Sequence, residues 1–246
     1  MTTTDPGAKW TEIEHLPEWD EEFYDVYTAK KFGKWVMLKT LKPELKDRPD
    51  MQAMLEREFE VRYNLANAHI IMINDLEEVP GLGRCIITDD VYGDSLAKLI
   101  ATDQVTADIV HKTAHDLADA LDYMQSNHIV HQPVNEHNII FTENVRNLKV
   151  INVGFDQKNE LEPTDVADDM KAYGRVLNLA LNACKEPVDP KLLAVAERCE
   201  SDNPYRSVAQ LQMALMGNSQ RTAYIACTAF LAIMVAILIL VLIMKP

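Results

Sequence analysis

The polar side chains between residues 128 and 141 are the first candidates for chemistry. This segment reads H-I-V-H-Q-P-V-N-E-H-N-I-I-F, so His131, Asn135 and Asn138 stand in one short stretch that ends in apolar residues. The Asn138 side chain can offer a neutral oxygen to a metal, or it can cap the local backbone. Pro133 lies in the middle of the stretch and has no group that could accept a proton. Proton transfer at its centre is therefore not predicted.

A second candidate is the pair His111 and His115, whose i, i+4 spacing on a helix could chelate zinc. Neither a third ligand nor a following general-base glutamate accompanies them, so two histidines on a helix flank are favoured and no metal site is predicted. The acidic run D-V-A-D-D-M at 165–170 is similarly read as a helix start, where carboxylates are stabilised, rather than as a cation site.

Charge and cysteine content exclude other classes of function. The chain of 246 residues has 24 basic and 38 acidic residues and a formal charge of −14, which disfavours a nucleic-acid partner. Its 4 cysteines are scattered without a C-x-x-C pair, so neither a disulfide framework nor a structural zinc site is predicted.

The elements that must position these groups fall into two parts. Residues 16–41 alternate around a turn at K-K-F-G-K and predict a hairpin, residues 49–66 predict a helix, and two apolar runs joined by P-G-L-G predict a second hairpin. From residue 95 the pattern is mostly helical, with a small hairpin at 141–151 and helices at 106–126, 166–184, 190–199 and 206–216. The fold class is therefore α+β with two lobes. We expect a polar tail at 1–15, a smaller lobe at 16–93 and a larger lobe at 94–216.

The C-terminal segment is expected to cross a membrane. After a short linker at 217–222, residues 223–244 carry no charge and would extend about 33 Å as a helix, enough to span a bilayer core of about 30 Å. Only Lys245 and Pro246 follow this segment, so a tail anchor is expected. The N-terminus has no apolar signal segment, and we expect the globular part to be cytoplasmic.

Six motifs follow one another along the chain: W-V-M-L-K ending at Lys39, L-E-R-E-F-E-V-R-Y-N-L around Glu58, C-I-I-T-D-D-V-Y-G-D-S-L around Thr88, the helix leading into I-V-H and N-I-I-F, D-M-K-A-Y-G-R-V-L at 169–177, and N-P-Y-R at 203–206. By these motifs the stretch from about Phe23 to Leu215 resembles a protein kinase domain. In this resemblance Thr88 is the gatekeeper, and the residues that follow it form the hinge. The resemblance implies a bilobal eukaryotic-type Ser/Thr kinase fold. With the C-terminal segment expected to cross a membrane, the protein is expected to be a bacterial-type, tail-anchored protein with this fold. It also implies that Lys39, Glu58 and Asn138 stand at nucleotide-site positions.

The parts that handle phosphate and metal depart from this family. The alignment puts Trp19, Glu21 and Tyr24 at the three glycine positions of the phosphate loop, where bulky and acidic groups would block or repel phosphate. The metal-binding Asp of the family is replaced by Asn152, whose neutral oxygen is a poor magnesium ligand. Asn138 is then the only family metal ligand left.

The catalytic loop and the substrate platform are degenerate as well. Pro133 replaces the catalytic Asp, and loss of a general base typically costs about 10²- to 10⁴-fold in rate. Asn135 replaces the family lysine, and Gln132 replaces the arginine that reads a phosphorylated activation loop. Only 14 residues separate Gly154 from Asp169, too few for a full activation segment.

Four other positions are expected to be structural. By the resemblance, His131 packs under the loop and Asp169 hydrogen-bonds the loop backbone. Arg206 matches an arginine that pairs with a glutamate of the missing A-P-E motif, and we expect it to pair with Glu162, with Glu160 or an exposed side chain as alternatives.

The expected function is a membrane-anchored pseudokinase that acts as a signalling or scaffolding module by contact with protein partners. It needs no metal and no cofactor. The alternatives are a degenerate kinase that still binds ATP and is weakly active, and a structural membrane subunit whose span pairs through small residues.

Overall fold

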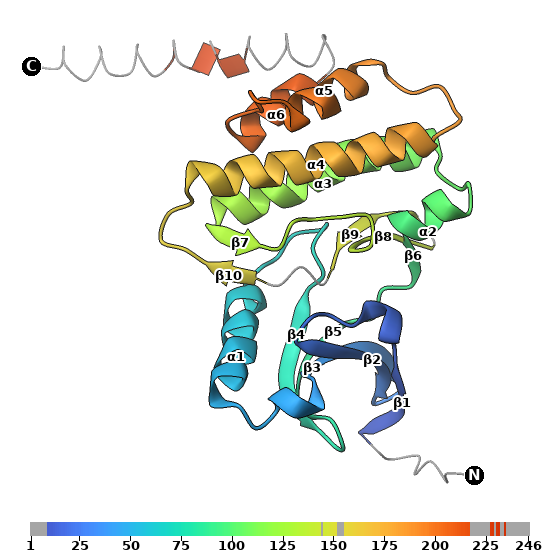
Figure 1. The fold of residues 1–246 in the computed structure, drawn as a ribbon, viewed down its shortest axis with the longest axis vertical. Helices are drawn as coiled ribbons and strands as arrows, with labels where there is room; N and C mark the ends of the chain where they lie inside the picture. The colour runs from blue at the N-terminus through green and yellow to red at the C-terminus, as the bar shows by residue number, and fades with distance from the viewer. Residues whose placement is uncertain are drawn as a thin grey trace, which may run out of the picture.

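The computed structural model describes residues 9–143, 145–151 and 155–216, together with 227, 228, 230, 231 and 234. Figure 1 shows two lobes: a sheet with one long helix at its side, and a larger lobe built mainly of helices. The α+β bilobal prediction is confirmed.

The smaller lobe is a five-stranded antiparallel sheet in the order β1-β2-β3-β5-β4. Its strands are β1 (Trp10–His15), β2 (Tyr24–Lys31), β3 (Lys34–Leu41), β4 (Ile73–Val79) and β5 (Gly83–Asp89), and helix α1 (Pro49–Tyr63) lies beside it. Two short 3-10 turns, η1 (Pro17–Trp19) and η2 (Pro43–Leu45), join these elements. Both hairpins and the helix that were predicted from the sequence are present.

The β2–β3 hairpin turns at Phe32 and Gly33, which have φ angles of 50° and 83°. Positive φ at both central residues is the geometry that matches the right-handed twist of the paired strands, and glycine adopts it without a steric penalty. The turn aligns Val26 with Lys39 across the ladder and so sets the register of the site lysine.

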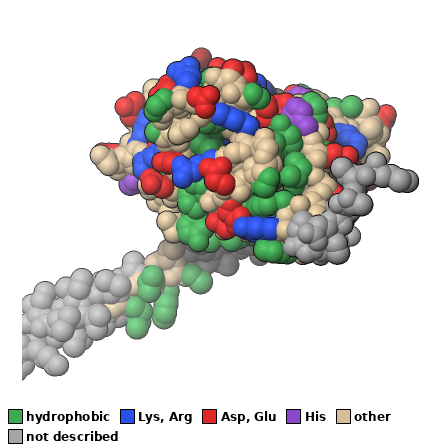
Figure 2. All heavy atoms as spheres, turned by 90° about the horizontal axis from the view of Figure 1, so that it is seen from below, with side chains coloured by type: hydrophobic (Ala, Val, Ile, Leu, Met, Phe, Trp, Pro, Cys, Tyr) green, Lys and Arg blue, Asp and Glu red, His purple; other side chains and the backbone are tan. Residues whose placement is uncertain are grey.

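Charged side chains of both signs lie next to one another on the molecular surface. In the view from below, basic and acidic groups are interspersed, with hydrophobic side chains between them (Figure 2). Ion pairs also join side chains of the smaller lobe, since Lys30 of β2 pairs with Glu12 and Lys34 of β3 pairs with Asp89. The excess of acidic residues in the chain is therefore not gathered into one patch on this face.

The predicted polar tail at 1–15 is wrong for its second half, because Trp10–His15 form β1 and pair with β2. An edge strand pairs on one side only and can stay mostly exposed, so it lacks the alternation of a half-buried strand. Its register shifts between Thr11 and Glu14, which breaks the period further.

Within the described residues, the larger lobe contains five helices and short paired strands. The helices are α2 (Leu96–Ala101), α3 (Ala107–Ser126), α4 (Pro163–Ala183), α5 (Lys191–Glu200) and α6 (Val208–Leu215). The strands are β6 (Gly93–Ser95), β7 (Ile129–His131), β8 (Ile139–Thr142), β9 (Leu148–Val150) and β10 (Phe155–Gln157). Helices α3 and α4 lie side by side in the middle of this lobe, between α5 and α6 on one side and the short strands on the other (Figure 1). Helix α3 corresponds to the helix predicted at 106–126, and its Leu117 and Leu121 side chains are fully buried.

The predicted membrane span at 223–244 lies outside the described residues, apart from a few scattered positions. Within the described part of the chain, no helix is both long and apolar enough to cross a bilayer.

Candidate functional site

Two adjoining cavities lie where the lobes meet. The polar cavity, of about 540 Å³, is lined by residues that include Glu18, Trp19, Glu21, Lys98, Asn135 and Asn138. The apolar cavity, of about 400 Å³, is lined by residues that include Glu22, Phe23, Tyr24, Met54, Val130 and His131. Glu21 and Gln132 line both cavities, so the loop before β2 and the loop after β7 form the wall between them.

Lys39 on β3 is buried among three partners. Its Nζ atom donates to Glu58 Oε1 at 2.9 Å and to Glu21 Oε2 at 2.8 Å. The ammonium also lies 4.1 Å from the centre of the Tyr24 ring. The structure therefore joins Lys39 and Glu58 as strand-to-helix partners, and it adds a second carboxylate to the same lysine.

Glu58 continues this arrangement into a buried network of alternating charge. Its Oε1 atom also accepts from Arg62 Nη1 at 2.9 Å, and Arg62 Nη2 donates to the Ile71 carbonyl at 3.4 Å. Burial opposes ionisation of Glu58, but Lys39 and Arg62 outweigh it and lower the pKa of this carboxyl. Burial, and then the Glu58 and Glu21 carboxylates, raise the pKa of Tyr24 well above its usual range.

Glu21 is the site residue whose role the sequence did not reveal. It stands at an expected glycine position, and the sequence predicted only that it would repel phosphate. In the fold it binds Lys39 directly, while its second oxygen, Oε1, is buried without a hydrogen-bond donor among the described residues. A carboxylate at a phosphate-loop position, opposite a strand lysine, is the signal that could have predicted this contact.

Trp19 fills the neighbouring space between the lobes. Its indole packs against Ile71, Ile140 and Ile151, together with Val91 of the predicted hinge. Trp19, Asn138 and Ile140 all line the polar cavity, so the indole lies on the same cavity as the catalytic loop.

Asp20 holds the loop that carries Trp19 and Glu21. Its Oδ1 atom accepts from the Val26 backbone N–H at 2.9 Å, and both of its carboxylate oxygens lie 3.0 Å from His15 Nε2. The Glu21 backbone N–H donates to the Tyr24 carbonyl at 2.9 Å. These contacts fix the loop against β2 and aim its side chains at the cleft.

The loop between β7 and β8 is held by its own asparagines. Asn138 Oδ1 accepts from the Asn135 backbone N–H at 2.8 Å, and Asn135 Oδ1 accepts from His137 N–H at 2.9 Å. Asn138 is buried, whereas Pro133 is exposed. Asn138 therefore serves as a local backbone cap in this structure. Asn152 lies outside the described residues.

His131 and Asp169 meet beneath this loop. His131 Nε2 lies 3.4 Å from Asp169 Oδ1, and its Nδ1 is 2.7 Å from the Gln132 carbonyl oxygen. Gln125 Nε2 donates to Asp169 Oδ2 at 2.7 Å. Burial raises the pKa of Asp169, and His131 partly offsets this effect. Asp169 thus contacts the side chains of His131 and Gln125 where the resemblance implied the loop backbone, and His131 makes the backbone contact.

The expected Arg206–Glu162 ion pair is wrong. Both residues line a cavity of about 540 Å³, yet within the described chain no ion pair joins Arg206 to Glu162 or Glu160. Glu162 instead caps the start of α4 in a reciprocal arrangement with Asp165. Arg206 is exposed just before α6, where a guanidinium is solvated and needs no fixed carboxylate.

The histidines with zinc-like spacing lie next to each other with their rings tilted by 40°. The rings of His111 and His115 are 4.3 Å apart, and burial is the first cause that lowers the pKa of His115. Among the described residues, the group whose ligand atoms lie within 4.8 Å of one another is a different one, His15 with Asp20 and Asp25. The hydrogen bond from Val26 to Asp20 gives that group a structural role.

Known proteins resemble this chain in sequence and fold. Residues 22–172 match the protein kinase domain family. A probable serine/threonine-protein kinase of Clostridium acetobutylicum is 30% identical over 109 residues, which is 44% of this chain but only 16% of that relative. The chain therefore spans a small fraction of that relative's length.

Solved structures give the same result. The PknI kinase domain of Mycobacterium tuberculosis has a TM-score of 0.63 at 20% identity, covering 85% of this chain and 95% of that domain. A point mutant of the same domain has a TM-score of 0.61 at 22% identity, covering 85% and 94%. Because the family match spans more than half of the sequence and the fold agrees over both lobes, the chain belongs to the protein kinase domain family.

Proposed function

We propose that this protein is a pseudokinase: a kinase-fold binding module, held at a membrane by residues 223–244, that acts by contact with a protein partner. The observation that carries this proposal is the Glu21 carboxylate on Lys39. In a kinase this lysine binds nucleotide phosphates. Here an acidic side chain of the same chain takes that position.

The charge of the cleft supports the absence of nucleotide. Glu18, Asp20 and Glu21 line the polar cavity, and the one cation among its described lining residues is Lys98, which already forms an ion pair with Asp94. Phosphates of ATP would be placed near several carboxylates without a compensating metal aspartate. ATP binding is therefore strongly disfavoured.

Two further side chains support the proposal. The Trp19 indole occupies apolar space between the hinge and Ile140, which a nucleotide base would need. Pro133 offers no proton acceptor at the catalytic position. The space for a nucleotide base, the lysine that would bind phosphate and the general base of a kinase are therefore all altered in this chain.

The second candidate function is a weakly active serine/threonine kinase that binds ATP. It is favoured by one observation, the intact Lys39–Glu58 ion pair at 2.9 Å. Glu21 would then have to leave Lys39 and expose it to the phosphates.

Thermal unfolding of the full-length protein in non-ionic detergent, with ATP and with Mg²⁺, Mn²⁺ or EDTA, separates the two functions. The pseudokinase is expected to show no ATP-dependent shift and no incorporation of labelled phosphate into itself or generic substrates. A metal-dependent shift, with incorporation that is lost in Lys39→Arg, would establish the kinase. This substitution keeps the buried positive charge, so loss of signal would not simply report unfolding.

A further inference from the structure

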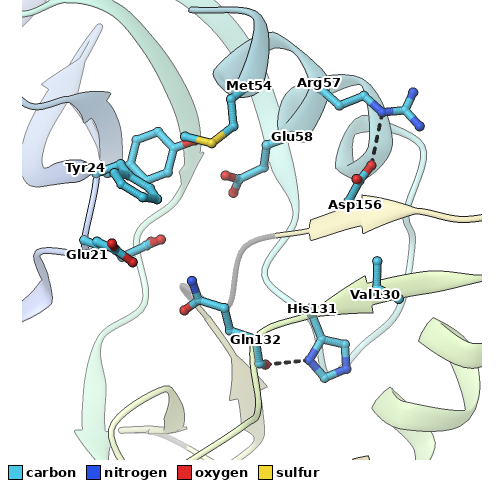
Figure 3. Close-up of a pocket in the computed structure, with 11 residues that line it drawn as sticks. Glu21, Tyr24, Met54, Arg57, Glu58, Val130, His131, Gln132 and Asp156 are labelled. Carbon is cyan, nitrogen blue, oxygen red and sulfur yellow. Dashed lines mark hydrogen bonds and ion pairs between the residues drawn. The ribbon is translucent and has the colours of Figure 1, made fainter. Parts of the chain in front are cut away.

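We propose that the apolar cavity beneath α1 receives an arginine or lysine side chain, presented with an apolar neighbour, from a partner protein. This inference rests on the proposed binding function and names the chemistry of the partner. It concerns the surface between α1, the loop before β2 and strand β7 (Figure 3).

The cavity has the size and lining for a long aliphatic side chain. Phe23, Met54 and Val130 supply apolar walls around a volume of about 400 Å³. Asp156 on β10 also lines the cavity and lies at its edge, since its side chain is 65% exposed. Arginine and lysine bury their methylene stems on such walls while the charged end finds a polar partner.

The charged groups of this cavity are mainly acidic. Glu58 is neutralised by Lys39 and Arg62, and Asp156 receives a hydrogen bond from Arg57 Nε at 3.2 Å. Glu22 is exposed at the rim and forms no ion pair within the described chain. This carboxylate is available to a cation that enters the cavity.

A buried oxygen of Glu21 is an independent sign that a ligand with a hydrogen-bond donor binds here. Its Oε2 atom binds Lys39, but Oε1 is buried without a hydrogen-bond partner in the described structure. A buried carboxylate oxygen without a donor costs free energy, and a guanidinium or ammonium from a ligand that reaches this oxygen would remove that cost. Lys39 does not remove this cost, since it donates to Oε2 of Glu21 and to Glu58 and makes no hydrogen bond to Oε1.

An anionic ligand does not fit the same place. In the family an arginine here reads a phosphorylated segment, whereas this chain has Gln132, a neutral residue that lines the cavity. Arg57 is the one cation among the described lining residues, and it is engaged with Asp156. A phosphate would meet Glu21, Glu22 and Glu58 at close range. This acidic surface is therefore opposite in charge to a surface that binds a phosphorylated segment.

Two fluorescent pentapeptides test the inference on the full-length protein in lipid nanodiscs of neutral lipid. One has the sequence Gly-Leu-Arg-Leu-Gly, and the other replaces arginine by citrulline, which has the same shape and no charge. Anisotropy is expected to show the arginine peptide bound roughly tenfold more tightly, with the difference shrinking as salt is raised from about 0.05 to 0.5 M. Equal binding of both peptides, or no binding of either, would overturn the inference.

Three variants locate the binding. Glu22→Gln removes the free rim carboxylate and is expected to weaken the arginine peptide about three- to tenfold, because one charge partner is lost. Arg57→Gln removes the competing cation and is expected to tighten it about two- to fivefold. Glu60→Gln, on an exposed part of α1 away from the cavity, is the matched control and should change nothing. All three side chains are exposed, so the fold is kept. If Glu60→Gln changed the affinity for the arginine peptide as much as Glu22→Gln does, the effect would come from the overall charge of the protein, and the proposed site would be overturned.

The ATP experiment distinguishes this inference from the proposed function. If neither ATP nor the arginine peptide binds, the peptide site fails and the pseudokinase stands. If ATP binds and phosphate is transferred, the pseudokinase proposal fails. The opposite effects of Glu22→Gln and Arg57→Gln on peptide affinity would then still show whether the arginine peptide binds in the apolar cavity.

Discussion

The ammonium of Lys39 lies 2.8 Å from the carboxylate of Glu21, a residue of the loop that would cover nucleotide phosphates in a kinase. Lys39 and Glu21 have side-chain exposures of 6% and 12%, so this contact is inside the protein rather than on its surface. Because Glu58 binds the same lysine from α1, the lysine connects loop, strand and helix. The kinase lysine has thereby become part of the structural core of the smaller lobe.

Replacement of Lys39 should destabilise the protein strongly. Lys39→Ala leaves Glu21 and Glu58 facing each other without their shared cation, and loss of one partner from a buried charge network typically costs about 3 to 5 kcal/mol. Urea unfolding of the full chain measures this change. Lys34→Ala on the same strand is the control, since its pair with Asp89 is exposed and is worth at most about 1 kcal/mol. Equal effects of the two variants would contradict the buried network.

Restoring the two lost aspartates should not restore activity. Pro133→Asp with Asn152→Asp returns the general base and the metal ligand, but Glu21 still occupies Lys39 and Trp19 still fills the space beside the hinge. Labelled-phosphate incorporation is expected to stay at background, more than about 10²-fold below a competent kinase. Incorporation of labelled phosphate by this double variant would show that Glu21 and Trp19 move aside when nucleotide binds.

Stability should fall in acid through Glu77 on β4. Its carboxylate binds Lys31 Nζ at 2.6 Å and also pairs with Lys9. Burial opposes ionisation, but these lysines lower the pKa of Glu77 from 4.5 to about 2. A lowered folded-state pKa means that the stabilisation is present above the unfolded value of 4.5 and is lost as the pH falls towards 2.

Glu77→Gln should therefore be less stable than wild type by about 1 to 3 kcal/mol at pH 6, with the difference shrinking between pH 4.5 and 2. Unfolding midpoints measured across this range test the sign. A difference that stays constant with pH would show that packing, not charge, is lost.

Helix packing in the larger lobe should be sensitive at Gly174. A Cβ atom there would lie 2.7 Å from the Cys199 side chain and 2.9 Å from the Ala196 carbonyl oxygen. Gly174→Ala should separate α4 from α5 and cost about 1 to 3 kcal/mol, despite the better helix propensity of alanine. Lys171→Ala, on the exposed face of α4, should stay within about 0.5 kcal/mol of wild type in the same denaturant series. A stabilised Gly174→Ala would mean that α5 has room to move.

Deletion of residues 223–244 should release the protein from membranes without unfolding it. The hydrophobic core of the larger lobe closes within residues 61–211 and includes α6, so none of its described members comes from the deleted segment. Fractionation of expressing cells and circular dichroism of the released protein measure the two halves of this prediction. Aggregation of the shortened chain would show that the segment belongs to the globular fold.

The sequence determined the elements and the family because both depend on patterns along the chain. The periodicity at 106–126, the K-K-F-G-K turn and the ordered kinase motifs each report local backbone preference and burial. These predictions reappear as α3, the β2–β3 hairpin and two lobes. Strand β1 was missed, because an edge strand needs little apolar alternation.

Only the tertiary structure decided which charges meet. Glu21, Lys39 and Glu58 come from a loop, a strand and a helix, and their contacts depend on how the loop folds against β2, which Asp20 controls through hydrogen bonds. The Arg206–Glu162 pair failed for the same reason: matching charges at family positions do not say whether a side chain is buried, and solvent removes the need for a partner. Burial sets the value of an ion pair, and burial is a property of the assembled fold.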